Sequence, residues 1–250
     1  MQKSYSFYPN TGYWFLLLIP LVFIGFYPTY FAPSSGKAPS VIHIHFTLMA
    51  LWVIILMVQP FLFRYKKLAL HRKLGKLTYV LVPLLLISAF FMIRFSYYRF
   101  IGNFYQQNAS ADPHQVLKEA ASYEAIAFLY FGWLALLYSM AIINRRRSSV
   151  HARYMVATAL TMLGPTVDRI VYSGFKVIKF GGIIPIETVS FFIADGILAI
   201  LLWKDYKNKK STKALMISLS IFVIGQTVYF LIQKTNAWTG FVAFVMQPIP

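Results

Sequence analysis

Seven stretches of the chain are almost wholly apolar, and each approaches the length of a helix that crosses a lipid bilayer. Such a helix needs about 20 mostly apolar residues, because the hydrocarbon core is about 30 Å thick. The stretches cover residues 13–30, 41–63, 77–98, 122–143, 152–171, 188–203 and 214–233. The pattern predicts an all-α fold, a seven-transmembrane-helix bundle that forms a single integral membrane domain over residues 1–250. No small-residue cleavage site follows the first stretch, which favours a retained helix over a signal peptide.

Basic residues concentrate in alternate turns between these stretches. Residues 64–76, 145–153 and 204–213 hold 15 of the 24 lysines and arginines and a single acid, Asp205. The positive-inside rule places these three turns in the cytoplasm. We expect both the N-terminus and the C-terminus to face outward.

Two segments outside the apolar stretches carry further signals. Asp112-Pro113, in the connection 102–121, is a helix start with Asp as N-cap and Pro at the first helical position. The fourth helix is therefore expected to begin above the membrane. The tail 234–250 has an apolar patch at 241–246 that is too short to span, and we expect it on the outer surface.

Composition supports a membrane protein. The chain is 58% apolar and 12% charged, whereas soluble domains carry about 25% charged residues. The net charge of +17 is explained by basic turns that face anionic lipid on the cytoplasmic face of the bilayer, since no soluble basic domain exists to bind nucleic acid. The absence of cysteine excludes a disulfide scaffold and a thiolate metal site.

Ionisable residues in the outer half of the bundle are candidates for a ligand pocket, because buried charge in a membrane is costly. His45 shares a helical stripe with Met49, Trp52, Leu56 and Gln59, so it is expected to face the interior. The other candidates are Arg94, Asp168, Arg169 and Asp195.

Two interpretations of these charges stay open. Asp168 or Asp195 pairs with Arg94 or Arg169 and ties helices together, or the group forms a water-filled pocket that binds or transports a small or anionic ligand. The arginines would neutralise the carboxylates first, which argues against a metal ion.

Two histidines at the cytoplasmic side suggest a different chemistry. His71 and His151 each follow a basic turn and open a long helix, and each helix has a proline further on. The two segments resemble a short internal repeat. Neutral imidazoles on facing helices are the usual axial ligands of haem b, so a membrane redox protein is one hypothesis. The alternative is that each His merely begins a helix near lipid headgroups.

The sequence excludes several functional classes and leaves a third hypothesis open. The last span has no lysine inside it, which excludes a retinal protein, and no metalloprotease, hydrolase or nucleotide-binding motif occurs. No catalytic residue is assigned, and enzyme activity stays open. The third hypothesis is a structural or assembly partner of another membrane protein, without a site of its own.

The sequence resembles a family of uncharacterised bacterial multi-pass membrane proteins that share an H-R-x-L-G turn. The resemblance covers roughly residues 41–172 and rests on His45, Trp52, His71, Arg72, Gly75, His151, Arg153, Tyr154 and Met155. It implies a location in the bacterial inner membrane. The family is distantly similar to b561-type cytochromes, in which histidines on consecutive helices hold two haems. The fourth span here lacks histidine, so the resemblance implies at most one haem, on His71 and His151.

Overall fold

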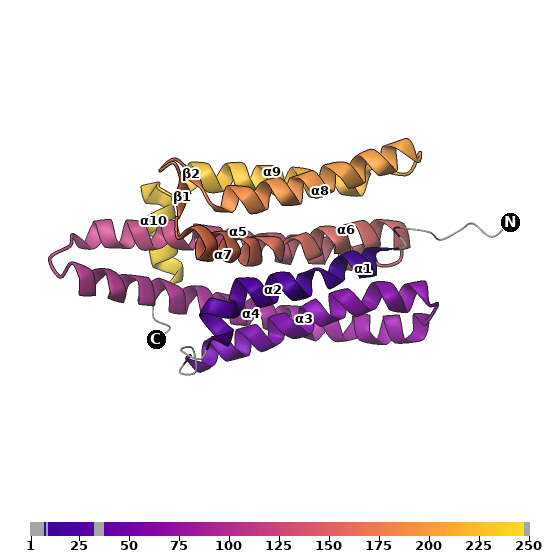
Figure 1. Cartoon of the computed structure of the whole chain (residues 1–250), viewed down its shortest axis with the longest axis horizontal. Coiled ribbons are helices and arrows are strands. Elements are labelled where there is room, and N and C mark those ends of the chain that lie inside the picture. The colour runs from indigo at the N-terminus through magenta and orange to yellow at the C-terminus, as the bar shows by residue number, and fades with distance from the viewer. Residues whose placement is uncertain (1–7, 9, 33–37, 248–250) are drawn as a thin grey trace.

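The computed structural model describes residue 8, residues 10–32 and residues 38–247, and it shows an elongated bundle of helices (Figure 1). The helices are α1 (Thr11–Leu16), α2 (Leu18–Phe26), the π-helix η1 (Tyr27–Phe31), α3 (Ser40–Arg64), α4 (Leu68–Gln107), α5 (Pro113–Ile143), α6 (Ser148–Leu160), α7 (Leu163–Phe175), α8 (Glu187–Lys207), α9 (Lys213–Ile232) and α10 (Asn236–Val245). A small antiparallel hairpin of β1 (Lys179–Phe180) and β2 (Ile184–Pro185) connects α7 to α8. The predicted all-α fold is confirmed.

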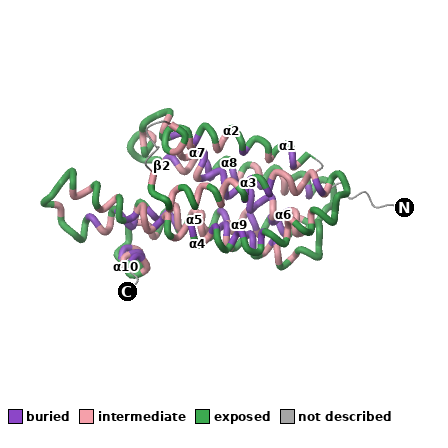
Figure 2. Tube along the Cα trace, turned by 90° about the horizontal axis from the view of Figure 1, so that it is seen from below, coloured by how far each residue is buried: buried purple, intermediate pink, exposed green. Residues whose placement is uncertain are grey.

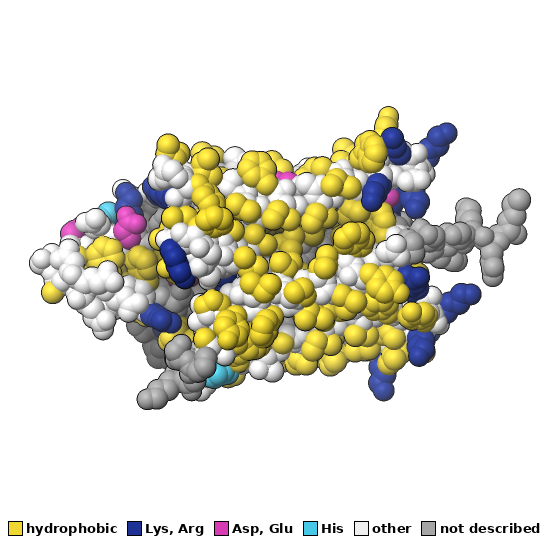
Figure 3. Space-filling model, viewed as in Figure 1, with side chains coloured by type: hydrophobic (Ala, Val, Ile, Leu, Met, Phe, Trp, Pro, Cys, Tyr) yellow, Lys and Arg dark blue, Asp and Glu magenta, His cyan; other side chains and the backbone are white. Residues whose placement is uncertain are grey.

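Five helical segments among the described residues are long and apolar enough to cross a membrane. They are Thr11–Phe31, α3, α4, α5 and α9. Apolar side chains cover the middle of the face shown in Figure 3, and Lys and Arg lie toward its two ends. Buried residues lie mainly where the helices face one another in the middle of the bundle (Figure 2). Many large apolar side chains are exposed on its outside. A surface of this kind suits lipid, and the chain is a membrane protein.

The predicted fifth stretch, 152–171, is not one helix. α6 ends at Leu160 and α7 begins at Leu163. Pro165 accounts for the break, because it has no N–H to donate and its ring crowds the carbonyl of Thr161. The predicted first stretch is interrupted in the same way: α1 ends at Leu16, four residues before Pro20.

α4 and α5 extend beyond the other helices as a hairpin (Figure 1). The 40 residues of α4 span about 60 Å, twice the thickness of the hydrocarbon core. α5 begins at Pro113, and the Asp112 side chain accepts a hydrogen bond of 3.0 Å from the backbone N–H of Gln115. The predicted helix start is therefore confirmed.

The tail folds as α10, which lies across α4 and α5 (Figure 1). The indole N–H of Trp238 donates to the Ala121 carbonyl at 2.8 Å, and the Tyr98 hydroxyl donates to the Met246 carbonyl at 2.5 Å. Val242 and Met246 are buried against the two long helices. The last residues of the tail, 248–250, lie outside the described residues.

The three basic turns lie at one end of the bundle, which we call the basic end (residues 65–67, 144–147 and 208–212) (Figures 1 and 3). Arg64 donates a hydrogen bond of 3.3 Å to the Asn10 side chain, and the Tyr8 hydroxyl donates to the Leu201 carbonyl at 3.3 Å. The first described residues thus lie at the basic end, whereas Gln247 lies at the opposite end. The expectation that both termini face outward is not confirmed, because the described residues nearest to them lie at opposite ends of the bundle.

Candidate functional site

Arg169 lies on α7 with its guanidinium against α2. Nη1 donates a hydrogen bond of 2.8 Å to the Pro165 carbonyl, and the guanidinium carbon lies 4.5 Å from the centre of the Phe26 ring. Within the part of the chain that the structure describes, Arg169 makes no ion pair. A guanidinium has five N–H donors, so most of its hydrogen-bonding capacity is left for water or a ligand.

Gly25 explains why Phe26 reaches Arg169. A Cβ atom at Gly25 would lie 2.7 Å from the Thr166 carbonyl oxygen, so the backbones of α2 and α7 are in direct contact there. Any larger residue would push the two helices apart. The absence of a side chain on α2 therefore sets the distance between the aromatic ring and the guanidinium.

Asp168, the neighbour of Arg169 in sequence, is bound by a neutral donor. The Tyr130 hydroxyl on α5 donates to Asp168 Oδ2 at 2.5 Å and lies 3.5 Å from the Ser190 hydroxyl on α8. Asp168 Oδ1 is buried without a hydrogen-bond partner. Gly164 makes room for this contact, since a Cβ there would lie 2.2 Å from the Tyr130 ring.

His45 on α3 faces the interior, as the sequence stripe predicts. Its Nδ1 lies 3.0 Å from the Ser88 hydroxyl on α4, and that hydroxyl donates its one proton to the Leu85 carbonyl at 2.8 Å. Nδ1 must then be the donor, which leaves Nε2 of the neutral ring as an acceptor.

The other two predicted pocket residues lie elsewhere. Asp195 Oδ1 accepts a hydrogen bond of 3.1 Å from Gln226 and joins α8 to α9. Arg94 Nη1 donates to the Gln247 carbonyl at 3.0 Å, and its guanidinium lies over the Tyr98 ring. Neither Arg94 nor Asp195 is hydrogen-bonded to His45, Asp168 or Arg169.

The hypothesis that these charges tie helices together as ion pairs is wrong for the described residues. The ion pair found there is a different one, Arg153–Asp205. The acids that were expected to meet arginines meet a tyrosine and an amide instead.

Five buried polar atoms in the described residues have no hydrogen-bond partner. Such atoms are uncommon in folded proteins and usually meet water or a ligand. They are Trp52 Nε1, Gln59 Oε1, His71 Nδ1, Glu124 Oε1 and Asp168 Oδ1. Trp52 and Gln59 lie on the predicted stripe of His45, and Trp52 has no exposed surface. The interior is thus polar at several levels between His45 and the basic end.

His71 and His151 lie near the starts of α4 and α6, at the basic end of the bundle. His151 Nδ1 lies 2.8 Å from the Ala141 carbonyl, which can only accept, so Nδ1 carries the proton and Nε2 is free. His71 Nδ1 is the unpartnered atom noted above, and the His71 ring packs edge-on against Phe63. The hypothesis that these two histidines hold one group between them stays a prediction.

Other polar residues of the interior escaped the sequence analysis. Tyr229 on α9 donates a short hydrogen bond to Glu187 at the start of α8, beside Ser190. Tyr130 lies in the middle of a predicted span rather than at its interfacial ends, and that position is the one available sequence signal. No group of three His, Cys, Asp or Glu suited to a metal ion occurs in the described ranges.

Comparisons of the chain with protein families, with curated proteins and with solved structures found no match. The resemblance to bacterial membrane proteins stays a prediction.

Proposed function

We propose that the chain crosses the inner membrane of a bacterium seven times and binds a small anionic ligand at Arg169, in the outer half of the bundle. The α6–α7 pair and α8 supply two crossings beyond the five long apolar segments. The positive-inside rule then places the basic end, with Tyr8 and Asn10, in the cytoplasm and α10 outside.

The observation that carries this proposal is the environment of the Arg169 guanidinium. It contacts a backbone carbonyl and an aromatic ring, while the adjacent carboxylate is bound by Tyr130. A guanidinium within a membrane bundle is costly unless an anion or water meets it. The unused donors and the absence of an ion pair among the described residues favour an anionic ligand.

The chemistry of the site narrows the ligand class. The planar fork of a guanidinium matches the two oxygens of a carboxylate or a phosphate. The Phe26 ring covers one side of the fork and supplies apolar contact. Nε2 of His45 offers an acceptor for a hydroxyl or a protonated oxygen of the same ligand.

The broken helix beside the site favours transport over simple binding. α7 begins at Leu163, about 9 Å along the helix from Arg169. Discontinuous helices near the middle of the bilayer are common at the substrate sites of transporters, because they free backbone groups and allow two rigid parts to move. The three buried threonines around the break, Thr158, Thr161 and Thr166, satisfy local carbonyls of α6 and α7.

Thermal unfolding of the detergent-purified protein tests the proposal. Sodium salts of phosphate, acetate and benzoate are compared with sodium chloride at equal ionic strength. We expect at least one of these anions to raise the unfolding temperature of the wild type and to have no such effect on Arg169→Gln, because ligand binding stabilises the folded state. Arg145→Gln is the matched control, since Arg145 also donates to a nearby backbone carbonyl but lies in the α5–α6 turn at the basic end. Equal responses of Arg169→Gln and the wild type would contradict the proposal.

His71 and His151 favour a second candidate function, a haem b redox protein. The two histidines fit a haem iron in part, because each imidazole keeps a ring nitrogen without a protein partner. The Ala141 carbonyl accepts from Nδ1 of His151 and so orients the ring, as hydrogen-bond acceptors behind metal-binding histidines commonly do. Bound haem would supply one-electron chemistry at this end of the bundle.

A visible absorption spectrum separates this candidate from the first. Protein purified from haem-supplied cells is expected to show a Soret band that shifts on reduction with dithionite and is lost in His151→Ala. A colourless wild type would rule the candidate out and leave the Arg169 proposal untouched.

A further inference from the structure

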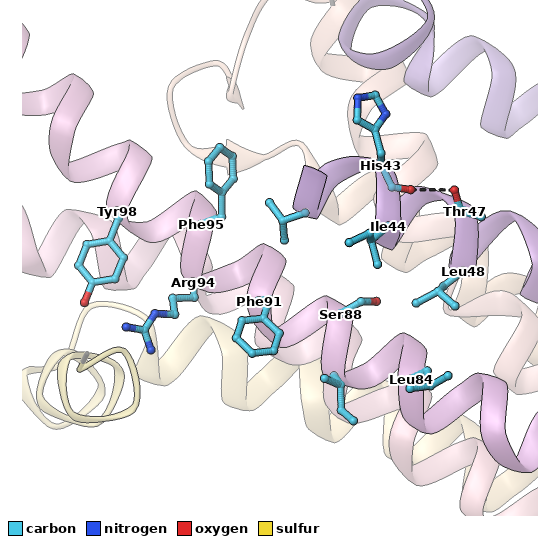
Figure 4. A pocket seen from close by; sticks show the side chains of 12 residues that line it. His43, Ile44, Thr47, Leu48, Leu84, Ser88, Phe91, Arg94, Phe95 and Tyr98 are labelled. Carbon is cyan, nitrogen blue, oxygen red and sulfur yellow. Dashed lines mark hydrogen bonds between the residues drawn. The ribbon is translucent and has the colours of Figure 1, made fainter. Parts of the chain in front are cut away.

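A groove of about 1000 Å³ runs between α3 and α4 in the half of the bundle away from the basic end (Figure 4). Its walls are apolar side chains, among them Ile44, Leu48, Leu84, Ile87 and Phe91. Figure 4 shows Arg94 and Tyr98 at one end of the groove and Leu84 toward the other. The groove therefore has a long apolar floor and one cationic end.

The length of the groove matches one leaflet of a bilayer. Arg94 lies ten residues beyond Leu84 on α4, which is about 15 Å along the helix. Half of a hydrocarbon core of about 30 Å is the same distance. With Leu84 near the bilayer centre, Arg94 lies at the level of the lipid headgroups.

The charge at the headgroup end is fixed in place. The Gln247 carbonyl accepts a hydrogen bond of 3.0 Å from Arg94 Nη1, and the Tyr98 ring lies 5.7 Å from the guanidinium carbon. None of the residues that line the groove is acidic. Arg94 has further N–H donors, and no acidic side chain lines the groove to compete for them, which favours an anionic group.

We propose that this groove holds one anionic phospholipid of the adjacent leaflet, with its phosphate on Arg94 and one acyl chain along Phe91, Ile87 and Leu84. This site is separate from the Arg169 site of the proposed function. The contact between them is Ser88, which lines the groove and accepts the hydrogen bond of His45.

Native mass spectrometry measures the lipid that stays bound. The full chain is purified and exchanged into equal amounts of dioleoylphosphatidylglycerol and dioleoylphosphatidylcholine. We expect the wild type to retain one phosphatidylglycerol in preference to phosphatidylcholine. Arg94→Gln should lower the retained phosphatidylglycerol about tenfold, the effect of losing one hydrogen bond to a charged group. Ile87→Trp should displace the acyl chain and lower the retention of both lipids.

Matched controls separate this site from the lipid that surrounds any membrane protein. Arg99→Gln removes an exposed arginine of the same helix end, and Val80→Trp enlarges an exposed position of α4 outside the groove. Both should retain phosphatidylglycerol as the wild type does. Ile44→Trp fills the groove from α3 and should reproduce Ile87→Trp if the latter variant folds poorly.

Equal retention of the two lipids by the wild type would overturn the proposal, as would equal losses in Arg94→Gln and Arg99→Gln. Arg169→Gln should leave lipid retention unchanged, so failure of this proposal and failure of the anion site are distinguishable.

Discussion

At the residue scale, the strongest electrostatic contact is the buried ion pair between α6 and α8 at the basic end. Arg153 Nε donates to Asp205 Oδ2 at 2.6 Å, and the two side chains are 2% and 1% exposed. Arg153 also donates to the carbonyl and the hydroxyl of Ser149. The pair joins two helices that are otherwise distant in sequence, and removing one partner leaves the other charge buried.

Asp205→Asn should therefore lower the free energy of unfolding by about 3–5 kcal/mol, the usual cost of stranding one charge of a buried pair. Denaturant titration in detergent measures it. Asp112→Asn is the control, because an exposed N-cap Asn still accepts the capping hydrogen bond. Similar stabilities of the two variants would show that Arg153–Asp205 is not a structural pair.

Tyr8 makes the stability of this end depend on pH. Burial and the neighbouring Asp205 carboxylate raise the pKa of Tyr8 well above its ordinary value. Above a pH of about 10, tyrosine in the unfolded chain loses its proton while folded Tyr8 keeps it. The stabilisation is thus fully present below that pH and is lost as the pH rises.

Tyr8→Phe removes this dependence. The difference in stability between the wild type and Tyr8→Phe is expected to shrink as the pH is raised from about 9 to about 11, across the ordinary tyrosine pKa. Denaturant titrations at several pH values measure it. A difference that stays constant over the range would show that Tyr8 does not contribute in this way.

At the element scale, close approaches of helices place the polar side chains. Gly25 brings α2 onto α7 at Thr166, and Gly164 lets the Tyr130 ring of α5 lie on α7. The resulting contacts, Phe26 with Arg169 and Tyr130 with Asp168, give the two adjacent charged residues different partners on different helices.

Gly164→Ala should destabilise the protein by about 1–3 kcal/mol, because the added methyl overlaps the Tyr130 ring in a well-packed core. Gly174→Ala on the same helix meets nothing within 4 Å and should be neutral or slightly stabilising. Thermal unfolding of both variants compares them. If Gly164→Ala were as stable as Gly174→Ala, the close packing of α5 on α7 would be contradicted.

The helices themselves could be predicted from hydrophobic pattern, but their breaks and partners could not. The length of the apolar stretches identifies α3, α4, α5 and α9. The spacing of His45, Trp52 and Gln59 identifies the inward face of α3. A proline alone does not predict a break, since Pro60 and Pro83 lie within continuous helices whereas α6 ends before Pro165. The partners of Asp168 and Arg169 come from α5 and α2, and no local pattern in α7 contains that information.

At the scale of the whole molecule, the arrangement of passes fixes which ends share a compartment. The basic turns and the first described residues lie at one end, and the α4–α5 turn lies at the other (Figure 1). The distribution of lysines and arginines along the sequence was sufficient to identify the basic end. Which compartment each end faces remains part of the proposal, and it follows from the positive-inside rule.

The lack of native cysteine makes this topology directly testable. Ser110→Cys lies in the outer turn, whereas Asn10→Cys and Ser211→Cys lie at the basic end, and all three positions are exposed. In spheroplasts, a membrane-impermeant maleimide should label Ser110→Cys at once and the other two only after permeabilisation. Labelling of Asn10→Cys from outside would contradict the proposed orientation.

The central claim is that Arg169 holds an anionic ligand, and the most direct measurement is the affinity of the purified protein for the most stabilising anion of the panel. Calorimetric titrations compare the wild type, Arg169→Gln and Arg145→Gln. We expect the wild type and Arg145→Gln to bind equally, and Arg169→Gln to bind at least about tenfold more weakly, since a hydrogen bond to a charged group is worth about 1.5–3 kcal/mol. Equal affinities of the wild type and Arg169→Gln would contradict the account.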